Sequence, residues 1–280
     1  MVKLGIALGR LHPSRHVEAV LEAEKLGFES AWLPEHLIFP TAMQGSPHPG
    51  DSHPPVPPTT PVFDAFAYLA FLAGKTKNLR LGTHVYLLGL RHPFVAARAA
   101  QTLDLVSNGR LELGIGAGWL ESEWRATGLD FKTRGRRLDE ALLVCKRLWS
   151  DPVIEHDGEF FSFEPVVFEP KPIQKPWPPV LVGGESPAAL RRAARMGNGW
   201  LGLTHTPESV RAPMERLQSL REQYETTDTL FQVSVGADIR DADDWKRWQD
   251  TGVHRLIVSP WKRSREAVDG LRRLEEIVKA

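Results

Sequence analysis

The stretch RLELGIG at residues 110–116 is a short apolar run, and a segment with helical spacing follows it. In that segment apolar side chains recur at intervals of three and four residues, so they share one face of a helix. These side chains are Leu138, Ala141, Leu142, Cys145, Leu148 and Trp149. A strand followed by an amphipathic helix is the repeating unit of folds that contain a parallel sheet.

The same unit recurs along the whole chain, and this repetition predicts the fold. The predicted strands are residues 3–8, 30–33, 79–87, 110–116, 179–183, 199–203, 231–238 and 255–259. The other predicted helices lie near residues 16–26, 62–75, 95–105, 187–196, 207–224, 241–251 and 267–278. Most of these strands are apolar without alternation, as expected where helices cover both faces of a parallel sheet. Eight such units predict one α/β domain, a (β/α)8 TIM barrel over residues 1–280, with a doubly wound open sheet as the alternative.

Two insertions interrupt this rhythm, one after the second predicted strand and one after the fourth. Residues 34–61 are rich in proline and lack periodicity, and we interpret this long loop as a lid. Residues 151–178 predict a small hairpin over 153–168 and an extended return. Because barrel active sites form where the strands end, we expect both insertions at the mouth of the barrel.

Composition and charge exclude several classes of function. Lys+Arg and Asp+Glu are equal at 35 each, so no basic excess indicates a nucleic-acid partner. No apolar run is long enough for a membrane span, and residues 1–6 lead into a strand without the features of a signal peptide. These observations predict a cytoplasmic protein. Cys145 is the only cysteine, so it forms neither an intrachain disulfide nor a cysteine-based metal cluster.

Four histidines near strand ends raise the question of a metal site. They are His12, His36, His84 and His92. The sequence lacks the His-x-His, the carboxylate cluster and the strand-end lysine of barrel hydrolases, so we expect no metal. His84 lies inside an apolar strand end and needs a partner there, and on its own it is more often a structural residue.

Glycine-rich turns follow two of the predicted strands. Residues 114–119 (GIGAGW) lack the G-x-G-x-x-G spacing of a dinucleotide fold, and we favour a cofactor-facing mouth over a structural turn. Residues 183–187 (GGESP) place Ser186 as an N-cap and proline at the first helical position, a start that suits a phosphate. An ordinary turn that binds nothing is the alternative. Trp119 and Trp200, at strand ends, are candidates to wall an aromatic ligand.

An acid and an imidazole, Glu35 and His36, directly follow the second predicted strand. At a barrel mouth such residues can transfer protons or hydrogen-bond the edge of a cofactor, since histidine titrates near neutrality. Adjacent residues do not automatically point the same way, so a solvated loop histidine is the alternative interpretation.

Together these motifs resemble the bacterial luciferase-like superfamily of flavin-dependent barrels, and especially its branch that uses the deazaflavin coenzyme F420. The match runs from residue 3 to about residue 203. The matching stretches are AWLPEH (31–36), LRLGT (79–83), RHP (91–93), SNGRLELGIGAGW (107–119), RGRRLDE (134–140), HDGEFF (156–161) and GGES (183–186). Each motif is weak alone, and their shared order and spacing carry the resemblance.

The resemblance implies a set of cofactor contacts. It implies that Glu35 and His36 contact the deazaflavin ring and assist proton movement, and that a non-proline cis peptide at His84–Val85 bulges against the ring. It also implies that the turn at residues 183–186 holds the cofactor phosphate. The full implied set is Glu35, His36, Thr83, His84, Val85, Ala117, Gly118, Trp119, Ser122, Gly183, Gly184, Glu185 and Ser186.

The chain departs from the family pattern at Trp119. Sugar-phosphate dehydrogenases of this branch have a glutamate there, and Glu121 and Glu123 are the nearby candidates to replace it. We find no Lys/Arg set suited to a sugar phosphate, so that substrate is not expected.

The resemblance thus implies hydride transfer between C5 of F420 and a small apolar or planar organic substrate, in a homodimer. An FMN-dependent monooxygenase, in which reduced flavin activates dioxygen, is the alternative enzyme, because both classes share the fold and most motifs. A non-catalytic barrel that only binds a ligand is the second alternative. The F420 tail carries extra carboxylates and would need an open, basic groove, whereas FMN would not.

Overall fold

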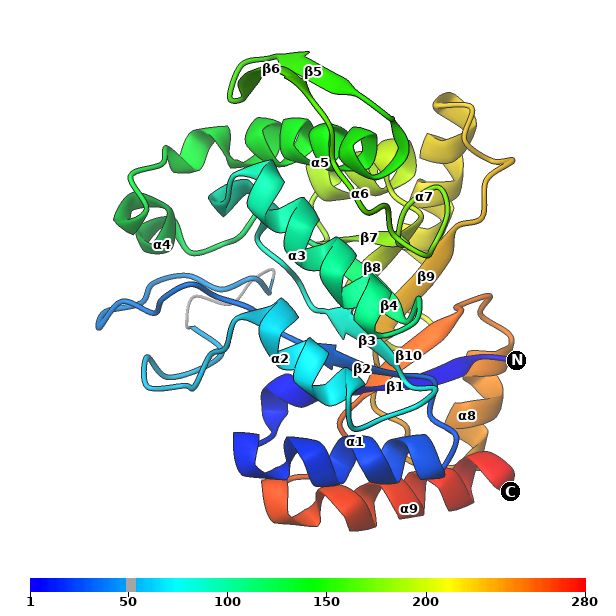
Figure 1. Ribbon diagram of the computed structural model, residues 1–280. Coiled ribbons are helices and arrows are strands. Elements are labelled where there is room, and N and C mark those ends of the chain that lie inside the picture. Colours follow the sequence, from blue (N-terminus) through cyan, green and yellow to red (C-terminus); the bar gives the residue numbers. More distant parts are fainter. Residues whose placement is uncertain (49–53) are drawn as a thin grey trace.

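The computed structural model of the chain is a closed barrel of parallel strands surrounded by helices (Figure 1). It describes residues 1–48 and 54–280, so His53 and the rest of segment 49–53 in the predicted lid lie outside the described residues. The strands follow one another around the barrel in the order β1-β10-β9-β8-β7-β4-β3-β2. Each neighbouring pair is parallel, and β1 also pairs with β2, which closes the barrel. The predicted fold is confirmed.

Each of the predicted strands forms a strand of the barrel. They are β1 (Lys3–Ala7), β2 (Ser30–Leu33), β3 (Arg80–Thr83), β4 (Leu111–Ile115), β7 (Val180–Gly183), β8 (Gly199–Thr204), β9 (Gln232–Gly236) and β10 (Arg255–Val258). The helices are α1 (His16–Lys25), α2 (Ala65–Ala73), α3 (Pro93–Val106), α4 (Glu121–Ala126), α5 (Arg134–Ser150), α6 (Pro187–Met196), α7 (Arg211–Gln223), α8 (Ala242–Gln249) and α9 (Ala267–Lys279). Within the described residues, none of these helices combines the length and apolarity needed to cross a membrane.

Local sequence signals fix where several helices begin. Asp64 caps α2 by accepting a hydrogen bond from the N–H of Ala67 at 2.8 Å, and Asp241 caps α8 in the same way. Pro93 and Pro187 occupy the first positions of α3 and α6, where a missing N–H is tolerated. The apolar stripe of α5, which includes Cys145, is buried against the barrel as its spacing predicts.

Two elements near the mouth differ from the prediction. Strand β3 was expected to reach residue 87 but ends at Thr83. Beyond it, Tyr86 forms a single parallel bridge to Ile115 of β4. Helix α4 was not predicted, because a helix of six residues is too short to show an apolar period.

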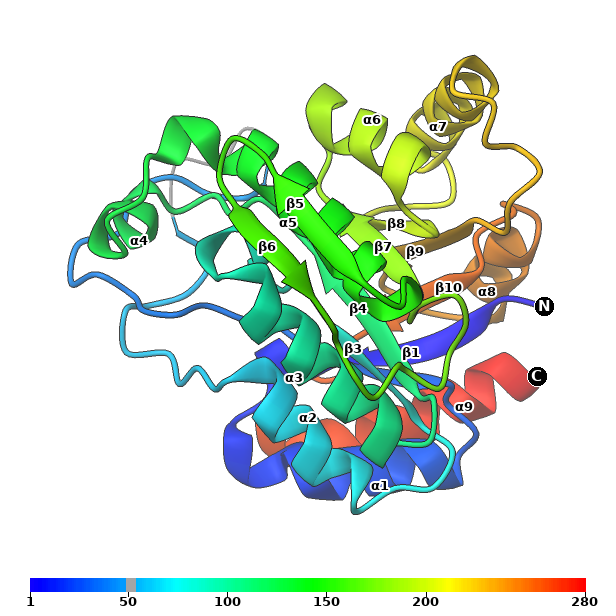
Figure 2. The ribbon, with the colours of Figure 1, turned by 45° about the horizontal axis from the view of Figure 1, so that its top comes forward.

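The second insertion covers the outside of helix α5 instead of forming the mouth. It contains an antiparallel hairpin of β5 (Ile154–Asp157) and β6 (Ser162–Val166) (Figure 2). Glu140 of α5 holds the hairpin, since its Oε1 accepts from the N–H of Phe161 at 2.9 Å. No residue of 151–178 lines the cavity at the mouth, so the expectation of a contribution there is wrong. The physical reason is that this segment follows a helix and not the carboxyl end of a strand.

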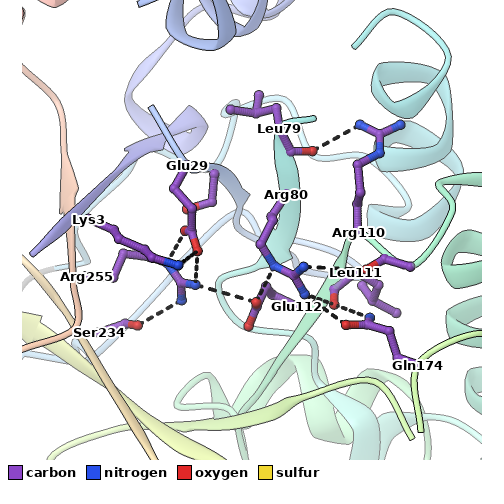
Figure 3. A network of polar contacts seen from close by, with 12 residues as sticks. Lys3, Glu29, Leu79, Arg80, Arg110, Leu111, Glu112, Gln174, Ser234 and Arg255 are labelled. Atoms are coloured by element: carbon purple, nitrogen blue, oxygen red, sulfur yellow. Dashed lines mark hydrogen bonds and ion pairs between the residues drawn. The ribbon is translucent and has the colours of Figure 1, made fainter. Parts of the chain in front are cut away.

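Charged side chains fill the barrel interior at the N-terminal ends of the strands (Figure 3). Arg255, which is 2% exposed, donates to Glu29 Oε2 at 2.5 Å and to Ser234 Oγ at 3.0 Å. Its guanidinium also lies 3.5 Å from Glu112, and Arg80 donates to the same Glu112 carboxylate. Buried charges are tolerated only when they are paired and hydrogen-bonded, so this network joins β3, β4, β9 and β10.

The variant Arg255→Met is expected to lower the free energy of unfolding by about 3–5 kcal/mol, because it removes the cation between Glu29 and Glu112. Arg272→Met is the matched control, since Arg272 pairs with Glu22 at the surface, where a pair contributes about 0–1 kcal/mol. Urea denaturation followed by circular dichroism measures both. A loss for Arg255→Met no larger than that of the control would contradict the role of the network.

Candidate functional site

A cavity of about 1260 Å³ opens at the carboxyl ends of the barrel strands. Described parts of the loop after β2, including Phe39, Val56 and Phe63, form one of its walls. The four strand ends that were expected to hold a cofactor meet here. The predicted site residues that line the cavity are Glu35, His36, His84, Val85, Ala117, Gly118, Trp119, Gly183, Gly184, Glu185 and Ser186.

Three residues that were expected to contact a ligand do not line this cavity. Thr83 is fully buried, and its Oγ1 donates to the carbonyl of Gly114 at 2.6 Å. Ser122 lies on α4, outside the set of lining residues. Trp200 is also fully buried, and its Nε1 donates to the carbonyl of Gly184 at 2.9 Å. Trp200 therefore braces the turn after β7 and does not wall a ligand.

Val85 forms a bulge in the floor of the cavity. A Cβ on Gly116 would lie 2.5 Å from Val85 Cγ2, and a Cβ on Gly183 would lie 2.6 Å from Val85 Cγ1. A side chain at either position would therefore overlap the side chain of Val85. The peptide bond between His84 and Val85 is cis, which confirms what the resemblance implied. The exposed edge of the valine, between two backbone segments without side chains, is a surface on which a flat ring can stack.

The turn after β7 is held by protein contacts that leave its backbone open to the cavity. Gly184 has a φ of +113°, a conformation that favours glycine. Glu185 Oε1 accepts from the N–H of Leu203 at 2.7 Å, and Ser186 Oγ accepts from the N–H of Ala189 at 3.2 Å as the cap of α6. The N-terminus of α6 thus borders the cavity, and such a helix start favours an anion such as phosphate.

Cationic side chains line the cavity from the start of α5, the turn before it and the middle of α6. We call them the basic rim: Lys132, Arg134, Arg136 and Arg192. Arg192 of α6 donates to the carbonyl of Gly135 at 3.1 Å and pairs with Asp139 of α5, which joins the two helices. Asp139 pairs with Arg192 and Glu159 pairs with Arg136, at 2.8 Å, so Lys132 and Arg134 supply the cationic excess of the basic rim.

His36 lies in the wall of the cavity and is held by Glu123 of α4. Nδ1 of His36 and Oε2 of Glu123 are 2.9 Å apart, and the other oxygen of Glu123 accepts from the N–H of Leu37 at 2.6 Å. The Glu123 side chain is fully buried, whereas that of His36 is 15% exposed. The imidazole also packs against Phe39 and Trp119, with ring centroids 4.6 and 5.9 Å away.

Glu35 is turned toward the loop after β3 and makes no pair with His36. Its Oε2 accepts from the N–H of Leu87 at 2.8 Å, and its Oε1 pairs with Arg91. Burial raises the pKa of the Glu35 carboxyl, and the Arg91 guanidinium offsets this only in part. The structure therefore places Glu35 and His36 with different partners, Arg91 and Glu123.

His84 lies at the floor of the cavity, inside the barrel. Its ring meets Trp32 edge-on, with the centroids 6.2 Å apart. Among the residues that the structure describes, its side chain has no hydrogen-bond partner. Burial lowers the pKa of His84 to about 4, so at neutral pH the imidazole keeps one N–H and one lone pair for a ligand.

Sequence reasoning missed two features of this site. Glu123 was only a candidate to replace an absent acid, and its contact with His36 joins residues 87 positions apart, which spacing cannot reveal. The basic rim combines RGRRLDE (134–140), which was noted without a role, with Arg192 from the next barrel unit. No group of three side chains suited to a metal ion occurs within residues 1–48 and 54–280.

Gly116→Ala is expected to destabilise the protein by about 1–3 kcal/mol, because the new Cβ overlaps the Val85 side chain. Val85→Ala removes the overlapping methyl groups, so in that background the same glycine substitution should have little effect. A double-mutant cycle on unfolding free energies measures this coupling. Additive losses would contradict the close contact.

His84 should make stability depend on pH. Its pKa is about 4 in the fold and about 6.5 in the unfolded chain, so the unfolded state binds the proton more tightly. Stability that is present above about pH 6.5 is therefore lost as the pH falls toward 4, by up to about 3 kcal/mol. His84→Leu should remove this part of the dependence. Urea unfolding at several pH values measures it, and identical profiles for both proteins would contradict the burial of a neutral imidazole.

Comparison with known proteins finds relatives of similar length and longer ones. The model of the luciferase-like monooxygenase family matches residues 4–276. The chain is 31% identical over 245 residues to an uncharacterized protein of Mycobacterium tuberculosis, covering 86% of each. It is 33% identical over 183 residues to the oxygenase component of the flavin-dependent trigonelline monooxygenase of Acinetobacter baylyi, covering 65% of this chain and 46% of that protein.

Among solved structures, an F420-dependent secondary alcohol dehydrogenase in complex with an F420-acetone adduct has the same fold. It matches with a TM-score of 0.78 and 16% identity, over 99% of this chain and 98% of that one. The family model spans nearly the whole barrel, including all of its strand ends at the cavity. The chain therefore belongs to the luciferase-like monooxygenase family.

Proposed function

We propose that this protein is an F420-dependent oxidoreductase that transfers a hydride between the deazaflavin and a small organic substrate. Proteins similar to it use either a flavin or F420, so the family alone leaves the cofactor open. The observation that carries our choice is the basic rim beside the turn after β7. A rim of several cations suits a tail with a phosphate and carboxylates, whereas FMN carries one phosphate.

The residues around the cavity fit such a cofactor. Val85 and the bare backbone at Gly116 and Gly183 form a floor on which a planar ring can lie. The turn after β7 and the start of α6 suit a phosphate, and the basic rim suits the anionic tail beyond it. His84 has an N–H and a lone pair available for the polar edge of a ring or for a substrate oxygen.

When bound, F420 supplies hydride chemistry at C5 of its ring. The chain supplies the surroundings for that chemistry. Phe39, Val56 and Phe63 give the cavity an apolar wall that limits the access of water. His36 lies in the wall, where it can hold or release a proton, and Trp119 packs against its ring.

An FMN-dependent monooxygenase is the second candidate. The Acinetobacter baylyi relative, at 33% identity, is flavin-dependent, and the turn after β7 suits the phosphate of FMN as well as that of F420. An F420 tail would need the cations of the basic rim, whereas FMN would not. A test of the rim therefore separates the two candidates.

Titration of the apo-protein with each cofactor separates the candidates. We expect micromolar or tighter binding of F420, weakened by salt because the tail is anionic, and weaker binding of FMN. Arg134→Gln should weaken F420 binding about tenfold, the effect of losing one charge-assisted contact, and should change FMN binding little. Arg125→Gln is the matched control, since Arg125 is exposed on α4 and does not line the cavity.

Binding of FMN without binding of F420 would overturn the proposal in favour of the second candidate. Binding of neither cofactor would indicate a barrel that only binds another ligand.

A further inference from the structure

The Glu123 carboxylate is enclosed by donors from the segment after β2. Its Oε1 accepts from the N–H of Leu37 at 2.6 Å and from the N–H of Ile38 at 3.4 Å. Its Oε2 lies 2.9 Å from Nδ1 of His36. The side chain is fully buried, so water does not compete for these contacts. One carboxylate thus fixes both the backbone of the loop and the ring of the histidine.

This contact determines which nitrogen of His36 carries the proton. An ionised carboxylate only accepts hydrogen bonds, so Nδ1 must donate to Glu123. In the neutral imidazole the proton then resides on Nδ1, and Nε2 keeps its lone pair. Nε2 has no hydrogen-bond partner among the described residues, and the ring lines the cavity.

We propose that Glu123 is a positioning residue that holds His36 as the Nδ1–H tautomer, so that Nε2 accepts and returns the proton of a substrate hydroxyl group. The role in turnover rests on the proposed function. If a bound deazaflavin took the hydride of such a hydroxyl-bearing carbon, the oxygen would lose its proton to Nε2 and a carbonyl would form. In the reverse direction Nε2 returns the proton as the carbon gains the hydride. Glu123 stabilises the charge that the imidazole carries between the two events.

Phe39 and Trp119 support the same assignment. Both rings pack against His36 and neither offers a second acceptor for its Nδ1 proton. Glu121 belongs to the same helix turn but is exposed and makes no contact with His36. The carboxylate at position 123 therefore acts on the imidazole, and the one at position 121 does not.

The substitution Glu123→Gln gives a sharp test because the two residues have the same shape. The amide oxygen of glutamine can still accept from the N–H of Leu37, which keeps the loop in place. The amide nitrogen then faces Nδ1 and can only donate, so Nδ1 must become the acceptor. The variant should invert the tautomer of His36 and place the proton on Nε2, where it blocks proton uptake.

Nitrogen-15 NMR of histidine-labelled apo-protein measures the tautomer without any cofactor. The wild-type protein and Glu121→Gln should show a protonated Nδ1 in His36, and Glu123→Gln should show a protonated Nε2. His36→Ala assigns the resonance. If wild type and Glu123→Gln have the same tautomer, the proposal is overturned, whichever cofactor the protein binds.

Turnover of the loaded enzyme is the second measurement. Glu123→Gln should lower kcat by about 10²–10⁴-fold, the range for loss of general acid–base catalysis, with KM changed little. Glu121→Gln should retain wild-type kcat. An inverted tautomer with unchanged kcat would refute the proton role of His36. Failure of F420 to bind, with the tautomers as expected, would refute the proposed cofactor and leave the positioning by Glu123 intact.

Discussion

The buried guanidinium of Arg255 links the strands at the N-terminal end of the barrel, and successive layers of side chains fill the interior from there toward the mouth. Its Cζ lies 5.1 Å from the ring centroid of Trp32, which in turn meets His84 edge-on. The apolar layer at this level consists of Trp32, Leu181, Leu201 and Ile257. Trp32 and His84 both line the cavity, so the cavity begins where this stack ends. Trp32 and its apolar layer therefore separate the charge network from the cavity.

At the mouth, His36 and Glu35 are each held by a residue from a different βα unit. His36 after β2 is held by Glu123 of α4, and Glu35 is held by Arg91, 56 positions further along the chain. A parallel barrel brings all its strand ends to one face, so loops that are distant in sequence become neighbours there.

The fold could be predicted from the sequence because its signals are local. Apolar runs, helical stripes such as that of α5, and caps such as Ser186 each act within a few residues. The sequence predicted which strand ends form the site. It could not predict which side chains pair with one another there. Glu35 next to His36 suggested a pair, yet Glu35 pairs with Arg91 and His36 pairs with Glu123. The partner of His36 lies on a helix too short to show a period, and the basic rim forms only where helices α5 and α6 pack together.

Two buried carboxylates lie at this mouth, and their surroundings separate their roles. A buried ion pair is weak evidence for stability, since apolar residues of similar volume often serve as well. Both oxygens of Glu35 meet protein donors, and its partner Arg91 also donates to the carbonyl of Leu87, which suits a structural clamp. Glu123 pairs instead with an imidazole whose second nitrogen remains available at the cavity wall. A paired group that keeps a reactive atom toward the cavity is better explained by chemistry than by folding, and this distinction supports the proposed proton role of His36 and the proposed positioning role of Glu123.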